Sequence, residues 1–255
     1  MKPVIIDKEK CVGCGECVKD CVTGYLRIAD GKAETKEAGC IKCGHCYAVC
    51  PAGAVSLNGM ETDGGELVSM SEFDNHKLLQ AMKSRRSVRR FKEKAVEPEK
   101  LEMILEAGRY CPTASNSQDV AFTILGSRQA ELEEICVKLF RKGSKLATPV
   151  YPSAANMEID DKFFFKGAPL VIVVSAKSTG NANLASSYME LMAESLGLGV
   201  LYSGFFVVCT RLSGKVRRIL QLPKGHEAKT CMVIGYPDVK YHRVPCRKPL
   251  TVKEL

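Results

Sequence analysis

Eight cysteines between residues 11 and 50 restrict what this chain can fold into more than any other feature. The pattern C-x2-C-x2-C-x3-C occurs over residues 11–21 and again over residues 40–50. Three thiolates on one such loop, loosened by glycine, can reach three irons of one cubane cluster, whereas the fourth cysteine lies beyond the loop and serves the other cluster. The spacing therefore predicts two 4Fe–4S clusters. The predicted ligands are Cys11, Cys14, Cys17 and Cys50 for the first cluster and Cys40, Cys43, Cys46 and Cys21 for the second.

Two other cysteine chemistries fit this pattern less well. Zinc sites usually present two C-x2-C pairs that are well separated along the chain. Disulfides require an oxidising compartment, and nothing in the sequence indicates one. His45 stands between two of the predicted ligands, and we expect it to face solvent without a role.

Over about its first sixty residues the chain resembles the bacterial two-cluster ferredoxins. It departs from them at Val22, which follows Cys21 where proline is usual; this can alter the loop beside one cluster but removes no ligand. Large apolar side chains are few in this segment. A domain this small generally needs cross-links such as disulfides or bound metal in addition to apolar burial. We therefore expect the clusters to serve as its core and iron removal to unfold it.

The length of 255 residues fits one small module and one ordinary domain. We predict a ferredoxin-like domain over residues 1–60, a polar, glycine-rich linker over 61–74 and a second domain over 75–255. No apolar run is long enough for a membrane span, and the first residues lack the features of a signal peptide. Because thirteen cysteines also indicate a reducing interior, the expected location is cytoplasmic, with no membrane partner.

The net charge of +8 raises the possibility of a nucleic-acid partner. However, the sequence contains neither a recognition-helix signature nor an aromatic and basic platform for single strands. The basic residues concentrate in segments 83–90 and 243–248. A local pocket for a phosphate-bearing cofactor explains them more simply, so no nucleic-acid partner is expected.

Residues 75–255 show helical and extended patterns in irregular alternation, which predicts an α+β domain with a mixed central sheet. The run 169–175 is apolar and rich in β-branched residues, so it should form a central strand buried on both faces. The predicted helices cover 75–84, a segment from Pro98, 132–140, 181–196 and a segment from Ser213, and the other predicted strands cover 120–125, 205–209 and 230–234.

Four motifs of this second domain occur in an order that resembles the nitroreductase family of FMN enzymes. They are the segments 85–91, 112–118, 196–205 and 234–250, which include Arg85-Arg86-Ser87-Val88-Arg89 and Tyr202-Ser203-Gly204-Phe205. The resemblance covers roughly residues 75–255 and implies an intertwined homodimer with two FMN sites at its interface. It departs from the family after Gln118, where Asp119-Val120 replaces the Pro-Trp of many relatives.

The resemblance also implies roles for individual residues. In the family, a fixed cation beside the flavin pyrimidine edge stabilises the anionic reduced ring, and a glycine N–H approaches flavin N5. No residue is required as a general acid or base, because solvent can supply the proton. The implied FMN contacts are Arg85, Arg86 and Ser87 at the phosphate and ribityl chain, Arg247 closing the phosphate site, Arg89 at the pyrimidine edge, Gly204 beside N5, Ser203 next to it in the same motif, and Pro112, Thr113, Ala114 and Asn116 reaching the flavin of the partner subunit.

Together the two halves predict a flavin- and iron–sulfur-dependent oxidoreductase. The clusters would receive electrons from reduced ferredoxin or a similar low-potential donor, and NAD(P)H, the other expected donor, would bind over the flavin. FMN N5 would then reduce a nitroaromatic, a quinone or an activated alkene. The aromatic residues Phe163, Phe164, Phe165 and Tyr151 are candidates for a lid over the flavin. The competing hypothesis is a non-catalytic subunit that relays electrons between ferredoxin or a partner enzyme and FMN.

Overall fold

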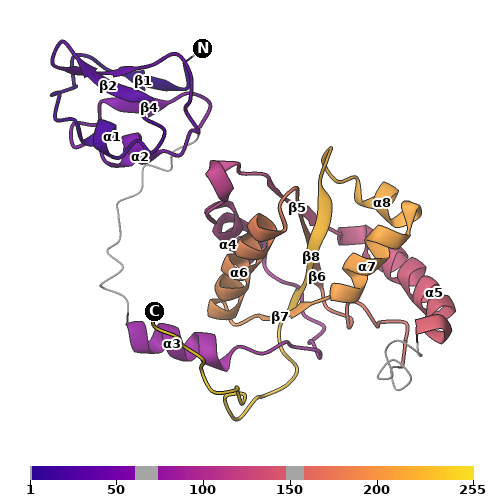
Figure 1. Ribbon diagram of the computed structural model, residues 1–255. Helices are drawn as coiled ribbons and strands as arrows, with labels where there is room; N and C mark the ends of the chain where they lie inside the picture. The colour runs from indigo at the N-terminus through magenta and orange to yellow at the C-terminus, as the bar shows by residue number, and fades with distance from the viewer. Residues whose placement is uncertain (1, 61–73, 148–157) are drawn as a thin grey trace. The chain divides into compact units, whose positions relative to one another are not determined.

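The computed structural model describes residues 2–60, 74–147 and 158–255. Within it the chain divides into two compact units, Met1–Met70 with Ala114–Ser117 and Ser71–Thr113 with Gln118–Leu255 (Figure 1). The predicted linker and Tyr151 lie almost wholly outside the described residues, Asp74 being the one linker position inside them. The domain boundaries at residues 60 and 75 therefore stay predictions.

The first unit consists of two small antiparallel sheets and two helices of a single turn each. One sheet joins the two ends of the cysteine-rich segment, since Val4 pairs with Leu57. The other sheet is a hairpin, in which Ala29 pairs with Lys32. The elements are β1 (Val4–Ile6), α1 (Glu16–Lys19), β2 (Leu26–Ala29), β3 (Lys32–Thr35), α2 (His45–Ala48) and β4 (Val55–Leu57).

Glycine shapes both cysteine loops of this unit. Gly15 (φ 79°) and Gly44 (φ 82°) occupy the left-handed region immediately before α1 and α2, which few other residues adopt without strain. Gly13 is constrained by space as well, because a Cβ there would lie 2.0 Å from the carbonyl oxygen of Gly31. The backbone can therefore turn sharply at each loop and bring the cysteines inward.

The core of the first unit is small and contains several of its own cysteines. Tyr25, Leu26 and Ala33 are each at most 3% exposed and pack together with Cys11 and Cys46. Apolar burial in so small a cluster contributes limited stability. Additional stabilisation of the cysteine side is therefore to be expected.

The second unit is built on a four-stranded sheet with the order β5-β6-β8-β7. All three pairings of these strands are antiparallel. Among the described residues, the parallel contribution that makes the sheet mixed, as predicted, is an isolated bridge between Ser87 and Val200. Every residue of β6 is buried, which confirms the predicted central strand. The strands are β5 (Val120–Ile124), β6 (Leu170–Ala176), β7 (Gly199–Tyr202) and β8 (Glu227–Gly235).

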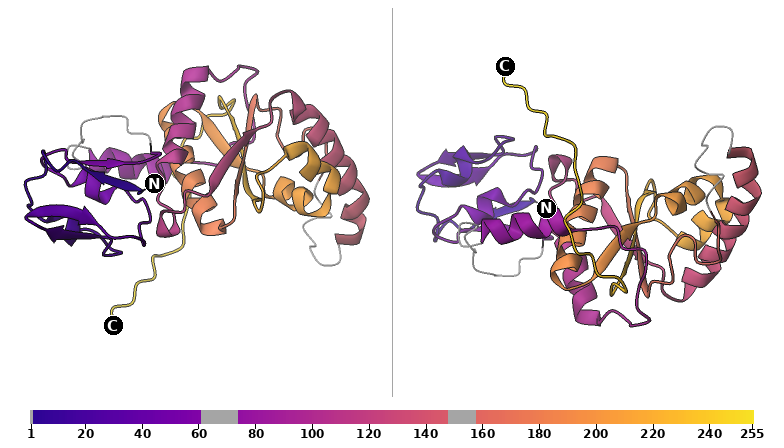
Figure 2. Two further views of the ribbon diagram at one scale, coloured as in Figure 1. Left: turned by 90° about the horizontal axis from the view of Figure 1, so that it is seen from above. Right: turned by 90° about the horizontal axis from the view of Figure 1, so that it is seen from below.

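Helices cover both faces of this sheet (Figures 1 and 2). Side chains alternate along β6, so Val171 and Val173 belong to one core cluster and Ile172 and Val174 to the other. The first cluster includes residues of α5, α7 and α8, and the second includes residues of α4 and α6. These helices are α4 (Pro98–Arg109), α5 (Gln129–Ala147), α6 (Thr179–Ser195), α7 (Gly204–Leu212) and α8 (Gly214–Leu220).

Most predicted helices are confirmed, and their start signals are local. The helix α3 (Asn75–Ser84) has the predicted bounds, and the Asp74 side chain accepts a hydrogen bond of 3.0 Å from the Lys77 N–H at its start. Ser213 caps α8 in the same way through the N–H of Val216. Within the described residues, no helix combines the length and the apolar character needed to cross a membrane.

One predicted element is wrong. Residues 205–209 form part of helix α7, not a strand. Its buried residues include Phe206, Val207 and Thr210, at the spacing of one helical face. A short apolar run of aromatic and β-branched residues fits a strand and a buried helix equally well, and here packing against the sheet selects the helix.

Candidate functional site

The first unit gathers its cysteines around two separate cavities. Cys11, Cys14, Cys17 and Cys50 line one cavity, and Cys21, Cys40, Cys43 and Cys46 line the other. Each set takes three cysteines from one motif and the fourth from the other motif, which is the grouping expected from the sequence. Within the described residues, no three His, Cys, Asp or Glu side chains lie close enough together to hold one metal ion. His45 is exposed, as predicted, with its Nδ1 3.2 Å from Asp20.

Backbone N–H groups donate hydrogen bonds to two sulfurs in each cavity. In the first, the Ala33 N–H lies 3.4 Å from Cys11 Sγ and the Ala54 N–H lies 3.3 Å from Cys50 Sγ. In the second, the corresponding pairs are Tyr25 with Cys21 at 3.2 Å and Lys42 with Cys40 at 3.3 Å. Such donors stabilise thiolate sulfur, and hydrogen bonds of this kind also adjust the potential of a bound cluster.

The cysteine pKa values differ according to these hydrogen bonds and to burial. The hydrogen bond from the Ala33 N–H is the largest influence on Cys11 and lowers its pKa. Burial, followed by the nearby Cys43, raises the pKa of Cys46 to about 11. A deeply placed thiolate such as Cys46 needs a compensating positive charge, which metal ligation supplies.

The second unit contains a cavity of about 490 Å³ beside the start of α7. Of the predicted contacts, Arg89, Ser203 and Gly204 line it. A Cβ built on Gly204 would meet no atom within 4 Å, so the missing side chain leaves open space at the first turn of the helix. The first intrahelical hydrogen bond runs from Val207 N–H to the Ser203 carbonyl, and the preceding N–H groups at the start of such a helix are available to bind an anionic or polar group.

Several residues that sequence reasoning did not assign also line this cavity. Lys166 brings a second cation, and its own backbone has a positive φ of 51°. Tyr202 and Phe205 complete the wall on the β7 and α7 side. The motif around Gly204 pointed to Tyr202, whereas no sequence pattern indicated Lys166, which comes from a turn between α5 and β6.

The predicted lid receives little support from this arrangement. Phe163 lines the cavity, as does Phe164, but Phe164 and Phe165 are at most 1% exposed and belong to the core. The Phe164 ring packs edge-on against Phe140, and the Phe165 ring packs at a tilt against Phe206, which keeps both rings in place. Tyr151 lies outside the described residues.

Arg85 lies at the end of α3 and forms an ion pair with Glu190 of α6. The guanidinium nitrogen is 2.8 Å from Glu190 Oε1, and Tyr202 donates a longer hydrogen bond of 3.5 Å to Glu190 Oε2. Glu194 lies one turn further along α6, and its buried Oε1 has no hydrogen-bond partner among the described residues. Burial, followed by the charge of Glu190, raises the pKa of Glu194 to about 7.

The other predicted contacts lie outside the cavity. Ser87 is held next to β7 by the bridge to Val200. Arg86 lies over the Tyr241 ring at 5.7 Å, and Arg247 is exposed and donates to the Cys246 carbonyl. Pro112, Thr113, Ala114 and Asn116 are expected at the flavin of the partner subunit, and that expectation stays a prediction. Within their own chain, the Thr113 hydroxyl accepts from the Gln118 N–H, and Asn116 has a φ of 51°.

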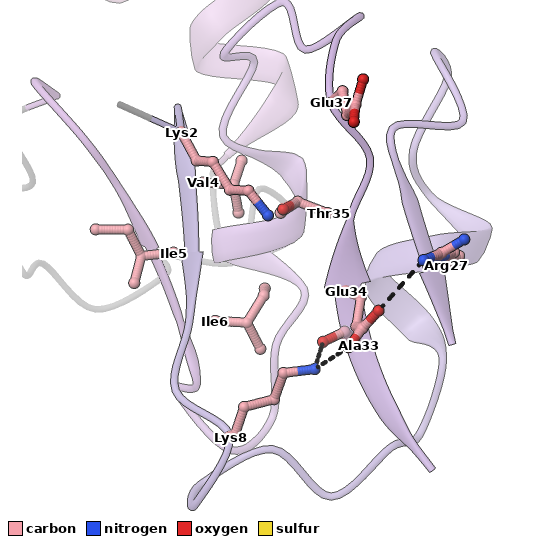
Figure 3. A pocket seen from close by; sticks show the side chains of 10 residues that line it. All are labelled: Lys2, Val4, Ile5, Ile6, Lys8, Arg27, Ala33, Glu34, Thr35 and Glu37. Carbon is pink, nitrogen blue, oxygen red and sulfur yellow. Dashed lines mark hydrogen bonds and ion pairs between the residues drawn. The ribbon is translucent and has the colours of Figure 1, made fainter. Parts of the chain in front are cut away.

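A further cavity lies between β1 and β3 of the first unit (Figure 3). Its charged lining is largely paired internally, because Lys8 and Arg27 both contact Glu34. This cavity contains no cysteine and is not part of the candidate site.

Comparison with known proteins assigns the two parts of the chain. Residues 82–236, more than half of the sequence, match the family model described as "Nitroreductase family". The chain belongs to the nitroreductase family. This membership confirms the predicted oxidoreductase class. Residues 3–51 match the model of a "4Fe-4S dicluster domain", which agrees with the two cysteine-lined cavities.

Solved nitroreductases have the same fold as the second unit. A nitroreductase with bound FMN from Bacteroides fragilis is 24% identical, with a TM-score of 0.58 over 70% of this chain and 99% of its own. One with bound FMN from Desulfitobacterium hafniense is 20% identical, with a TM-score of 0.59 over 70% and 98%. These likenesses confirm the predicted α+β fold.

A curated relative comes from Methanothermobacter thermautotrophicus. It is described as "Putative NADH dehydrogenase/NAD(P)H nitroreductase" and is 27% identical over 169 residues. The match covers 63% of this chain and 77% of the relative.

Proposed function

We propose that this nitroreductase-family protein is an FMN-dependent oxidoreductase that receives electrons through two 4Fe–4S clusters and reduces a small organic acceptor. The observation that carries the proposal is that one chain holds both kinds of site. Two cysteine quartets surround two cavities in the first unit, and a cavity with two cations and an open glycine lies in the second.

The residues that line the cavity beside α7, in the second unit, fit the isoalloxazine ring of FMN. Its walls combine aromatic and aliphatic side chains, which suit a flat aromatic ring, with a few polar groups that can orient it. The absent Cβ of Gly204 leaves room for close approach of a ring to the backbone. We therefore assign Arg89, Lys166, Ser203 and Gly204 as ring contacts.

The phosphate end of FMN would lie toward Arg85 and Ser87. The Arg85 guanidinium has five N–H donors, and the ion pair with Glu190 engages one of its terminal nitrogens. The remaining donors can bind a phosphate, and Glu190 holds the guanidinium while they do so. We retain Arg86 and Arg247 as phosphate contacts that require rearrangement of the exposed side chains.

The chain contributes positioning and electrostatics to the reaction. When bound, FMN exchanges single electrons with the clusters and electron pairs with an organic acceptor. Arg89 and Lys166 bring positive charge to the cavity that favours the reduced, anionic ring, which raises its potential. The cavity is open enough for solvent to supply protons, and we assign no side chain as a general acid or base.

We further propose that the protein is a homodimer with reduced ferredoxin or NAD(P)H as electron donor and a nitroaromatic, quinone or activated alkene as acceptor. Support for a second copy comes from apolar side chains that the single chain leaves uncovered. Leu79 and Met82 of α3 are 49% and 44% exposed, and Leu250 near the end of the chain is 89% exposed. Apolar groups gathered on one helix commonly mark an interface.

Anaerobic purification followed by cofactor analysis tests the proposal. We expect iron and sulfide for two clusters together with FMN, and turnover of at least one acceptor with reduced ferredoxin, NADH or NADPH. Rapid turnover of a small acceptor without a protein partner would exclude the relay hypothesis. A preparation that contains iron and sulfide but never FMN, even after reconstitution, would contradict the proposed flavin site.

A further inference from the structure

Tyr25 carries a buried hydroxyl group with no partner. The residue is 2% exposed and belongs to the core of the first unit. Its hydroxyl oxygen is inaccessible to solvent and has no hydrogen-bond partner among the described residues. Burying a hydroxyl without a partner costs free energy, so such groups in proteins are rare and call for an explanation.

The position of Tyr25 suggests where the missing partner lies. Its backbone N–H donates to Cys21 Sγ at 3.2 Å, and the residue lines the cavity formed by Cys21, Cys40, Cys43 and Cys46. A cluster held by these cysteines would place thiolate and sulfide sulfurs, all hydrogen-bond acceptors, in that cavity.

We propose that the Tyr25 hydroxyl donates a hydrogen bond to a sulfur of the cluster held by the second quartet, and that it raises the potential of this cluster above that of the first. The inference rests on the cluster assignment made under the proposed function. It adds a residue that distinguishes two sites whose cysteine motifs are the same.

The linings of the two cavities differ in the way that this inference requires. Apart from its cysteines, the first cavity is lined by aliphatic residues and glycines, without any side-chain donor. The second is lined by Thr23, Tyr25, Lys42 and His45 as well, and Thr23 Oγ1 lies 3.6 Å from Cys21 Sγ. Because donors near sulfur stabilise the added negative charge, the reduced state is favoured at the second site.

The consequence is an order of electron flow within the first unit. With a cluster bound at each quartet, each would accept one electron, and an electron that entered at the first quartet would pass to the second, where the hydroxyl groups of Tyr25 and Thr23 would stabilise the added charge. No further oxidant or reductant is needed for this internal step.

The inference is tested by the potentials of the two clusters, followed by electron paramagnetic resonance during anaerobic redox titration of the full chain. In Tyr25→Phe we expect the step at higher potential to move to lower potential by about 59 mV or more, which is a tenfold change in its one-electron equilibrium. Tyr47→Phe is the matched control, since Tyr47 belongs to the same unit and is 41% exposed; both of its steps should stay in place.

A second variant identifies which cluster responds. Thr23→Val removes the hydroxyl beside Cys21, so it should shift the same step as Tyr25→Phe. Tyr25→Leu also lacks the hydroxyl and should reproduce the shift if the phenylalanine variant folds poorly. The inference would be overturned if the Tyr25 variants left both potentials unchanged or shifted both steps equally. It would also be overturned if the Tyr25 and Thr23 variants shifted different steps. Loss of iron from the unmodified protein would instead contradict the proposed function.

Discussion

The Arg85 guanidinium lies 2.8 Å from the Glu190 carboxylate, although the two residues are 105 positions apart in the chain. The Glu190 side chain is only 10% exposed, so the pair is largely screened from water. A buried pair of this kind is costly to break from one side, because the remaining charge loses its partner. It therefore fixes Arg85 at the end of α3, where the phosphate of FMN is proposed to bind.

Replacing Arg85 and Ser87 together by alanine should abolish FMN retention. The double variant removes a charge-assisted phosphate contact and a hydroxyl, so we expect at least a tenfold loss of FMN affinity, about 1.4 kcal/mol or more. Flavin absorbance after desalting, with cluster absorbance as the internal reference, measures the effect. The matched control is Ser127→Ala with Arg128→Ala, an exposed Ser-Arg pair outside the cavity; equal retention by both double variants would remove the phosphate-site assignment.

Gly204→Val should weaken flavin binding without harming the fold. Gly204 has no positive φ, and its Cβ direction is open, so the new side chain enters the cavity instead of the core. Gly214→Val provides the control, because Gly214 is likewise the first residue of a helix. We expect lower FMN affinity in the first variant alone, with melting temperatures of the apoprotein close to those of the wild type in both. Tight FMN binding by Gly204→Val would show that the ring lies elsewhere.

The stability of the second unit should fall as pH rises from about 4.5 to about 7. Glu194 has an ordinary pKa of 4.5 when unfolded and a pKa of about 7 when folded, raised by burial and by Glu190. Between these values the folded state binds more protons than the unfolded state, so raising the pH favours unfolding.

Thermal unfolding of wild type and Glu194→Gln across this range measures the effect. The glutamine variant cannot lose the proton, and we expect a flatter dependence of its melting temperature on pH. Glu102→Gln, on the exposed side of α4, is a control that should retain the wild-type slope. The same slope in wild type and Glu194→Gln would assign the titration to another group.

Iron chelation should unfold the first unit and leave the second folded. The cysteines are part of the small core around Tyr25 and Leu26, whereas the second unit has two separate apolar clusters of its own. Limited proteolysis after anaerobic chelation should therefore cleave within residues 2–60 and spare the sheet of the second unit. A chelated protein whose first unit resists protease as well as the untreated protein would mean that apolar packing alone maintains its fold.

Local sequence signals decided much of the secondary structure. The helix 75–84 begins where Asp74 can cap it, and Pro98 opens the next helix, both through contacts within one turn. The run 169–175 is apolar up to Ser175, and such a strand has to be covered on both faces. The cysteine spacing likewise indicated the cluster chemistry, because the reach of a short loop limits which sulfurs can share one cluster.

Long-range packing decided the rest. Residues 205–209 became a helix because one side of that run fits against the sheet, and nothing within the run itself excluded a strand. The partner of Arg85 could not be inferred locally either, since α6 had to be placed against α3 before Glu190 could be recognised. The signal that the sequence did offer was the position of Glu190 among the buried residues of α6, because a buried carboxylate usually has a charged partner. Hydrogen bonds and burial between distant segments depend on how whole helices and strands pack against one another. Local sequence does not show that packing, because it is set by the fold of the whole chain.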